Sequence, residues 1–297
     1  MNTQAVPDVS GEFDFSDAQF KVIAQLAYEN FGLDLQPAKR SLVYSRLTRR
    51  LRALRLPNFK SYLDLLTGPD GAAEQSEMLS ALTTNVTHFF REKHHFDQFR
   101  DLILPEAIKS ARNGGRVRFW SAGCSAGQEP YSIAMCVLEA CPDAARYDIR
   151  ILATDVDPVI LARAKAGLYL SEERDSLPAD HKDRMTIAAD RPGEFTLVPE
   201  VKNLVQFGLL NLVKEWPVRG PFQAIFCRNV AIYFDKLTQA RLWSRFAPLL
   251  ETEGMLFIGH SERISGPAIS LFNSTGITSY RRNAQKAEMT SKTEISR

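Results

Sequence analysis

Apolar positions in the first eighty residues recur every three or four residues, which is the period of a helix. Ser16 followed by Gln19 is a capping-box signature before an apolar stripe that ends at Gly32. The same spacing predicts a second helix between Pro37 and Pro57, and two more follow it. The apolar stripes are Phe20, Ile23, Ala24, Ala27 and Phe31; Leu47, Leu51 and Leu54; Phe59, Tyr62, Leu63 and Leu66 after the cap Asn58; and Met78, Leu79 and Leu82. A small all-helical domain is therefore predicted over residues 1–82.

From about residue 91 the pattern changes, and short β-rich runs alternate with helical stretches. The expected strands are 116–123, 148–155, 222–229, 254–260 and 278–282, and the expected helices are 130–141, 157–166 and 235–250. This alternation predicts an α/β domain over 96–282 with a mainly parallel sheet. Residues 168–207 interrupt it with strand candidates at 194–198 and 203–207, so we expect an inserted β-hairpin there. The polar residues 283–297 are expected to form a disordered tail.

Length and composition narrow the class of protein. A chain of 297 residues is long enough for about two domains with cores of their own. No uncharged apolar run approaches the roughly 18–20 residues of a membrane-spanning helix, and the start lacks the regions of a signal peptide. The four cysteines show neither a CxxC spacing nor a disulfide framework; they are Cys124, Cys136, Cys141 and Cys227. We therefore expect buried thiols in a cytoplasmic protein without direct membrane insertion.

The formal net charge of +2 conceals a strong partition of charge. Residues 1–35 carry six acids and one base, whereas residues 36–60 carry eight bases and no acid. Arg46, Arg49 and Arg50 stand at i, i+3 and i+4 on a helix face that the leucine stripe does not use. This face is either a solvated surface or a docking surface for an acidic partner. Aromatic residues are not interleaved with the bases, so we favour an acidic protein over nucleic acid.

A turn with two glycines, WSAGCSAGQEP at 120–130, joins the first expected strand to a helix. Such a turn lies at the edge of an α/β sheet where ligands bind, and its glycines permit close backbone approach. It has neither the GK[ST] of a P-loop nor the third glycine of GxGxxG, which disfavours nucleotide phosphates. Glu129 stands where a phosphate would need bare amides. A cationic or hydroxylated ligand is favoured.

The same turn also matches G-x-S-x-G, the nucleophile elbow of α/β-hydrolases. His260 as the base and Asp235 as the acid would complete a triad in the correct chain order. Against this alternative, the turn follows the first strand of the sheet instead of a late one. The chain also shows no separate oxyanion-hole motif. The serine hydrolase is therefore the weaker interpretation.

Asp155 ends the second expected strand of the α/β domain, in LATDVDP. A carboxylate there can accept hydrogen bonds from both hydroxyls of a ribose, as in dinucleotide folds. One acid after each of the first two strands, without phosphate-binding features, suits an adenosyl ligand with a positive amino-acid arm. These residues predict S-adenosylmethionine as the ligand.

Five motifs in order resemble those of the bacterial chemotaxis-receptor methyltransferases, the CheR family. They are LTTNVTHFFREKHHF (82–96), WSAGCSAGQEPYSIA (120–134), ATDVD (153–157), FCRNVAIYFD (226–235) and GHSE (259–262). The resemblance covers about residues 15–282. It implies a helical domain, a linker over 83–95 and a Rossmann-like methyltransferase domain with a β-subdomain. It also implies methylation of glutamate side chains on chemoreceptor signalling helices, with S-adenosylhomocysteine as the second product.

Carried over by motif, the resemblance implies residues for binding cofactor and substrate. The cofactor contacts would be Asn85, Thr87, Arg91, Glu129, Asp155, Asn211, Leu212, Asn229 and Val230. The basic helix would dock the receptor. Some family members bind a receptor tail pentapeptide through a glycine-rich loop of the β-subdomain, but the corresponding AADRPGEF (188–195) has one glycine. We expect no such tether here, and tight binding of a receptor tail peptide would contradict this.

The chemistry of the expected reaction needs few catalytic groups. A glutamate carboxylate, with a pKa near ~4.3, is ionised at neutral pH and needs no general base. Arg91 or Tyr233 could hold it beside the methyl group, and Tyr233 has packing as its alternative role. His94 and His95 are adjacent, point about 100° apart on a helix and cannot chelate a metal by themselves, so no metal is expected. We expect the protein to be a monomer. Two alternative functions remain beside the serine hydrolase: a catalytically idle cofactor-binding module and a nucleic-acid methyltransferase.

Overall fold

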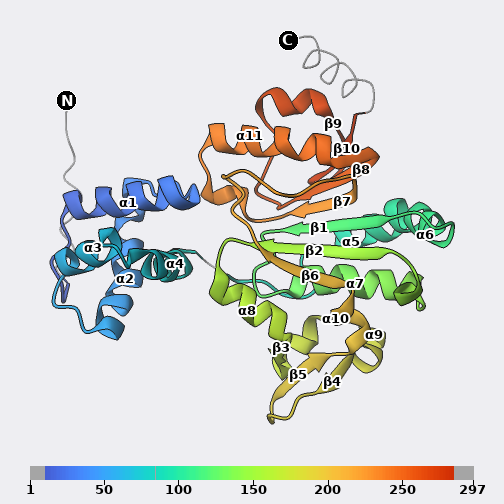
Figure 1. Ribbon diagram of the computed structural model, residues 1–297, viewed down its shortest axis with the longest axis horizontal. Helices are drawn as coiled ribbons and strands as arrows, with labels where there is room; N and C mark the ends of the chain where they lie inside the picture. The colour runs from blue at the N-terminus through green and yellow to red at the C-terminus, as the bar shows by residue number, and fades with distance from the viewer. Residues whose placement is uncertain (1–10, 84, 284–297) are drawn as a thin grey trace. The chain divides into compact units, whose positions relative to one another are not determined.

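The computed structural model describes residues 11–83 and 85–283 and divides the chain into two compact units, 1–84 and 85–297 (Figure 1). The division falls inside the predicted linker 83–95. The predicted disordered tail lies outside the described residues except for Asn283, as do residues 1–10. Within the described ranges, no helix is both long and apolar enough to cross a membrane.

The described part of the first unit contains four α-helices. They are α1 (Asp17–Phe31), α2 (Arg40–Leu54), preceded by the 3-10 turn η1 (Pro37–Lys39), α3 (Phe59–Thr67) and α4 (Gly71–Leu82). Ser16 and Gln19 form the predicted capping box of α1, and Gly32 ends it in the left-handed conformation. Asn58 caps α3 by accepting the Ser61 amide. The four predicted helices are confirmed.

The buried face of α2 differs from the predicted one at its end. Leu47 and Leu51 are fully buried, and Val43 lies beside them. Leu54 is exposed, so its assignment to the buried stripe was wrong. The helix ends at this residue, because Arg55 turns into the left-handed region with φ 55°, and the last apolar position leaves the core.

The second unit contains a seven-stranded sheet in the order β6-β2-β1-β7-β8-β10-β9. Its strands are β1 (Val117–Ala122), β2 (Ile149–Asp155), β6 (Val205–Leu209), β7 (Phe222–Cys227), β8 (Leu250–Ile258), β9 (Phe272–Gly276) and β10 (Ser279–Arg282). The first five in chain order are parallel, whereas β10 is antiparallel to both β8 and β9. The predicted mainly parallel sheet is confirmed, and β9 was not predicted.

Helices cover both faces of this sheet. They are α5 (Lys93–Gln98), which continues through a π-helical stretch η2 (Phe99–Ile103) into α6 (Leu104–Arg112), then α7 (Gln128–Ala140), α8 (Pro158–Ala166), α10 (Pro199–Asn203) and α11 (Lys236–Phe246). Figure 1 shows α7 and α11 on opposite sides of the strands. Alternate strand residues explain this layering: Phe119 belongs to the core with α6 and α7, and Trp120 to the core with α11.

The insertion differs from the predicted hairpin. A small antiparallel sheet in the order β3-β5-β4 is formed by β3 (Leu168–Leu170), β4 (Thr186–Ala188) and β5 (Glu194–Leu197), with α9 (Ala179–Arg184) before β4. The candidate at 203–207 belongs instead to β6 of the main sheet, where Phe207 pairs with Ala153 of β2. The inserted segment therefore ends before β6. The pairing of 194–198 with 203–207 was wrong because an apolar run predicts a strand but not its partner.

Candidate cofactor-binding site

The parallel strands of the main sheet bring the candidate residues to one edge. Along the chain the sheet grows from β1 to β2 and β6 on one side, then to β7 and β8 on the other. The order reverses between β1 and β7, and ligands of open α/β sheets bind in the crevice at such a point. Asp155 is the last residue of β2, and Glu129, Asn211 and Asn229 come after the carboxyl ends of β1, β6 and β7.

The turn between β1 and α7 depends on its two glycines. Gly123 and Gly127 have φ values of 89° and 95°, in the left-handed region. A Cβ atom on Gly123 would lie 2.3 Å from Cγ2 of Val230, so the loops after β1 and β7 could not approach as they do. The amides of Gly123 and Cys124 donate to the Thr154 carbonyl at 2.8 and 2.9 Å. Both glycines thus allow close packing within this turn, and close approach of their backbone to a ligand stays a prediction.

Asp155 ends β2 and points into the glycine turn. Its Oδ2 accepts the amide of Ser125 at 2.8 Å, and its Oδ1 accepts the amide of Asp157 at 3.1 Å. A carboxylate has about four acceptor positions, so capacity remains for hydroxyl donors. Burial raises the pKa of Asp155 above its ordinary value, although the two amides oppose the shift. The neighbouring Asp157 has a different role, because it caps α8 by accepting the amides of Val159 and Ile160.

Glu129 lies in the first turn of α7, beside the end of β1. The Ser121 hydroxyl donates to its Oε1 at 2.6 Å, and Arg228 Nη1 lies 3.2 Å from its Oε2. Its side chain is 13% exposed, and burial raises its pKa against the opposing charge of Arg228. The carboxylate is therefore held in one orientation from two sides.

Arg228 and Glu92 hold the candidate site residues in place, but they were not predicted from the sequence. The Arg228 side chain is 2% exposed and follows β7 directly. Its guanidinium pairs with Glu129, lies 3.7 Å from Oε2 of Glu92 and donates to the Arg91 carbonyl. It also lies over the Phe96 ring, 5.5 Å from the centroid. The sequence did hold a signal for Arg228: the residue directly follows β7, whose only clearly polar residue is a glutamine.

The linker segment 85–92 contributes the next candidates. Asn85, Thr87 and Arg91 are half-buried. Arg91 donates from Nη1 to the Val86 carbonyl at 2.9 Å, which leaves other guanidinium donors for a ligand. The Asn85 carbonyl accepts a 3.5 Å hydrogen bond from Ser125 of the glycine turn. The segment therefore contacts the same turn as Asp155.

Two candidates follow β6, the strand that the sequence assigned to a hairpin. The Leu210 amide donates to the Asp155 carbonyl at 2.9 Å, so the ends of β6 and β2 stay together. Asn211 accepts the Val213 amide at 3.0 Å with its Oδ1. Leu212 is buried in the core with α11. Asn211 thus stands close to Asp155 in the fold, whereas Leu212 is largely covered.

The loop after β7 carries Asn229, Val230 and Tyr233. Asn229 has φ 59°, a left-handed conformation in which Asn is one of the tolerated residues. A 3-10 turn, η5 (Ala231–Tyr233), follows it, and Tyr233 is half-buried. The glycine turn contacts Val230, so this loop borders the candidate site.

The three residues of the possible hydrolase triad, Ser125, His260 and Asp235, each contact different parts of the chain. Ser125 donates to the Asn85 carbonyl, and His260 lies 3.3 Å from Oε1 of Glu92 with its side chain 64% exposed. Asp235 caps α11 by accepting the Leu237 amide at 2.8 Å. A catalytic triad requires hydrogen bonds from serine to histidine to acid, and these contacts do not favour one.

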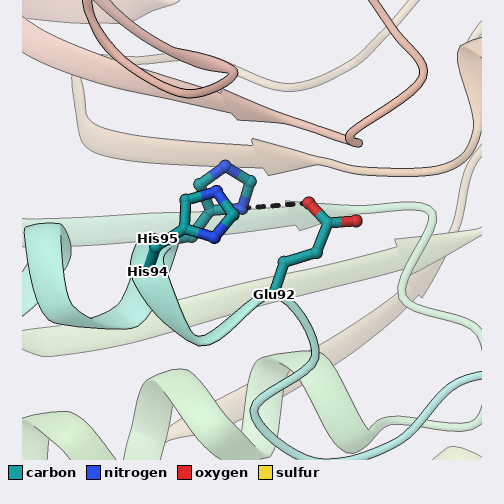
Figure 2. A group of neighbouring side chains, drawn as sticks. All are labelled: Glu92, His94 and His95. Atoms are coloured by element: carbon teal, nitrogen blue, oxygen red, sulfur yellow. Dashed lines mark ion pairs between the residues drawn. The ribbon is translucent and has the colours of Figure 1, made fainter.

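Glu92, His94 and His95 form a group of possible metal ligands at the start of α5. Their ligand atoms lie within 4.8 Å of one another, and Figure 2 shows the Glu92 carboxylate directed toward His95. The histidine spacing alone did not point to Glu92 as a third ligand. The Arg228 guanidinium beside the same carboxylate opposes a divalent cation through its charge. That no metal binds remains a prediction.

His95 is fully buried and joins α5 to the loop before β10. Its Nε2 lies 3.2 Å from the Ile277 carbonyl and 3.0 Å from Thr278 Oγ1. Burial, together with the charge of Arg228, lowers the pKa of His95 to about 3. The ring is therefore neutral at physiological pH.

The three arginines of the predicted docking face differ in their contacts. Arg46 donates to the carbonyls of Leu82 and Thr83 at the end of α4, at 2.6 and 3.1 Å. Arg50 pairs at 2.6 Å with Glu74, which is buried. Arg49 is exposed. Two of the three thus hold the helical domain together, an alternative role that residue spacing could not reveal. Their part in docking remains a prediction.

Comparison with known proteins identifies the family. The model of the CheR methyltransferase SAM-binding domain matches residues 85–281, and that of the CheR all-alpha domain matches residues 18–83. A probable chemotaxis protein methyltransferase of Rhizobium etli is 50% identical over 86% of this chain and 96% of its own length. The chemotaxis protein methyltransferase of Salmonella typhimurium is 41% identical over 96% and 97%, and that of Escherichia coli 43% over 84% and 86%. This chain belongs to the CheR methyltransferase family, with an all-helical domain before its S-adenosylmethionine-binding domain.

Proposed function

We propose that this chain methylates glutamate side chains of chemoreceptors, with S-adenosylmethionine as methyl donor, and forms glutamate methyl esters. One observation carries the proposal: two half-buried carboxylates, Glu129 and Asp155, lie at the end of β1 and the glycine turn that follows it, beside the point where the sheet order reverses. The family supplies the reaction class, and relatives of nearly the same length are chemotaxis protein methyltransferases.

The residues present fit the cofactor. Asp155 keeps acceptor capacity for ribose hydroxyls, and Glu129 presents negative charge toward a ligand that carries an ammonium and a sulfonium. At Gly123 the backbone of the glycine turn packs directly against the Val230 side chain of the loop after β7. When bound, S-adenosylmethionine supplies a methyl group that is open to in-line displacement from sulfur.

The chain's own residues then have to position two reactants. The substrate carboxylate is already ionised at neutral pH, so orientation and exclusion of water supply the catalysis. We assign Arg91 and Tyr233 to hold that carboxylate, Arg91 through guanidinium donors not used on Val86 and Tyr233 through its hydroxyl.

A Tyr233→Phe variant should lower kcat without weakening binding of S-adenosylhomocysteine. Unchanged kcat would return Tyr233 to a packing role.

The ester itself gives a direct test of the function. After incubation with methyl-labelled S-adenosylmethionine and chemoreceptor membranes, mild alkali should release labelled methanol from the receptor band. Esters hydrolyse under these conditions, whereas methylated nitrogen does not. Alkali-stable label would indicate another acceptor. Cofactor binding without any label would indicate the idle binding module.

Receptor docking can be tested with the exposed member of the basic face. An Arg49→Glu variant should raise the KM for receptor about fivefold, the equivalent of roughly 1 kcal/mol, and leave cofactor affinity unchanged. The rise should shrink at high salt. Lys60→Glu, an exposed charge on α3, is the matched control. Replacing Arg46 or Arg50 is less informative, because either change also removes contacts within the helical domain. Equal KM values for Arg49→Glu and Lys60→Glu would leave this face without a docking role.

We further propose that the protein acts as a cytoplasmic monomer. All four cysteines are free and buried, which fits a reducing compartment. The receptor segments that it modifies are the cytoplasmic signalling helices.

A further inference from the structure

Glu262 is a buried acid that neither the cofactor nor the docking assignments use. It belongs to the GHSE motif at 259–262, directly after β8, and is 5% exposed. A buried carboxylate requires charge partners or several hydrogen bonds. Its surroundings therefore indicate what it does.

The carboxylate of Glu262 accepts backbone amides from two loops. Its Oε2 accepts the amides of Gly259 at 2.5 Å and Asn229 at 3.1 Å, and its Oε1 accepts the amide of Ile232 at 3.2 Å. Gly259 lies in the loop after β8, whereas Asn229 and Ile232 lie in the loop after β7. Burial raises the pKa of Glu262, and these amides oppose the shift. One side chain thus joins the two loops.

The two loops also approach too closely for a side chain at residue 259. A Cβ atom on Gly259 would lie 2.5 Å from Nδ2 of Asn229, 2.6 Å from its backbone nitrogen and 2.9 Å from Oε2 of Glu262. Asn229 itself is in the sparsely populated left-handed region. Its conformation persists because the surrounding contacts, among them that of Glu262, determine it.

We propose that Glu262 is a positioning residue that fixes the turn from Asn229 to Tyr233 for cofactor binding and substrate orientation. This inference rests on the proposed function, since it gives that turn its task. Glu262 contacts the amides on both sides of Val230, whose side chain borders Gly123 of the glycine turn. Displacing the Asn229 amide would therefore shift the wall of the site, and displacing Ile232 would shift the neighbouring Tyr233.

The isosteric variant Glu262→Gln separates this role from packing. The glutamine amide has the same shape, but its NH₂ group would face a backbone N–H where an oxygen now accepts. We expect at least a tenfold loss of kcat and at least a tenfold rise in the Kd for S-adenosylhomocysteine. The matched control is Glu253→Gln, an exposed acid of β8 paired with Arg281 of β10, which should change neither value more than twofold.

A second variant keeps the inference testable if Glu262→Gln folds poorly. Gly259→Ala retains the carboxylate but forces Asn229 away, so it should give the same combined loss of kcat and affinity. Calorimetric titration with S-adenosylhomocysteine needs no receptor, so affinity loss can be judged even if the receptor reaction fails. Loss of receptor methylation by the unaltered chain would contradict the proposed function instead. Kd and kcat within twofold of the unaltered chain in either variant would overturn the positioning role.

Discussion

Replacing Arg228 with methionine should destabilise the methyltransferase domain by about 3–5 kcal/mol near neutral pH. The guanidinium is the buried cation that pairs with Glu129 and lies beside Glu92, and its side chain is 2% exposed. Without it two largely buried carboxylates would lose the cation that lies against both of them. Urea unfolding, followed by a probe of this domain, measures the loss. Cofactor affinity should fall as well, because Arg228 also holds the Arg91 carbonyl and Glu129.

The pH dependence of this loss has a definite sign. Removing Arg228 raises the pKa of both carboxyl groups in the folded state, so the variant takes up protons at higher pH than the unaltered chain. When carboxyl pKa values are higher in the folded than in the unfolded chain, the free energy of unfolding is reduced at high pH. It rises again as these groups become protonated at lower pH. The destabilisation should therefore be larger at about pH 8 than at about pH 5.5.

Arg118→Met is the matched control for Arg228. Arg118 pairs with Asp148 at 2.6 Å, but Asp148 is 53% exposed, so the pair is worth at most about 1 kcal/mol. If Arg228→Met and Arg118→Met unfold at the same urea concentration, Arg228 does not compensate the buried acids.

The second large effect is expected at Asp155. Asp155→Ala should weaken binding of S-adenosylhomocysteine at least about 100-fold, because hydrogen bonds to a charged group contribute about 1.5–3 kcal/mol each and two ribose hydroxyls would lose their acceptor. Asp155→Asn keeps the shape and tests the charge alone. Titration calorimetry measures both variants.

Burial adds a pH dependence to this prediction. The raised pKa of Asp155 means that its protonation, and with it the loss of affinity, begins at a higher pH than for an exposed aspartate. Affinity should therefore fall as the pH is lowered, with a weaker fall in Asp155→Asn. The control Asp157→Asn should bind within about threefold of the unaltered chain, because asparagine caps helices as well as aspartate. Unchanged affinity in Asp155→Ala would contradict the ribose assignment.

Local chemistry made much of this fold predictable. The capping box at Ser16, the glycine that ends α1 and the cap at Asn58 depend on residues a few positions apart, and all three are present. The positions of Glu129, in the helix after β1, and of Asp155, at the end of β2, were also predictable, because a parallel sheet brings its strand ends to one edge.

Features that depend on distant partners were missed or misread. The run at 203–207 predicted a strand, but only the tertiary structure pairs it with β2. Helical spacing placed Arg46 and Arg50 on one face without revealing the carbonyls and the acid of α4 that they contact. Arg228 and Glu262 each satisfy groups on several loops, and no local pattern encodes such contacts.

Burial of the thiols beside the site has a further consequence. Cys124 lies in the glycine turn and Cys227 ends β7, with exposures of 1% and 0%, and burial raises the pKa of both thiols. Since the thiolate is the reactive form, an alkylating reagent can modify them only in molecules whose sheet edge has opened. The rate at which these thiols are alkylated therefore reports how often this edge opens. A ligand that binds across the edge would lower that rate.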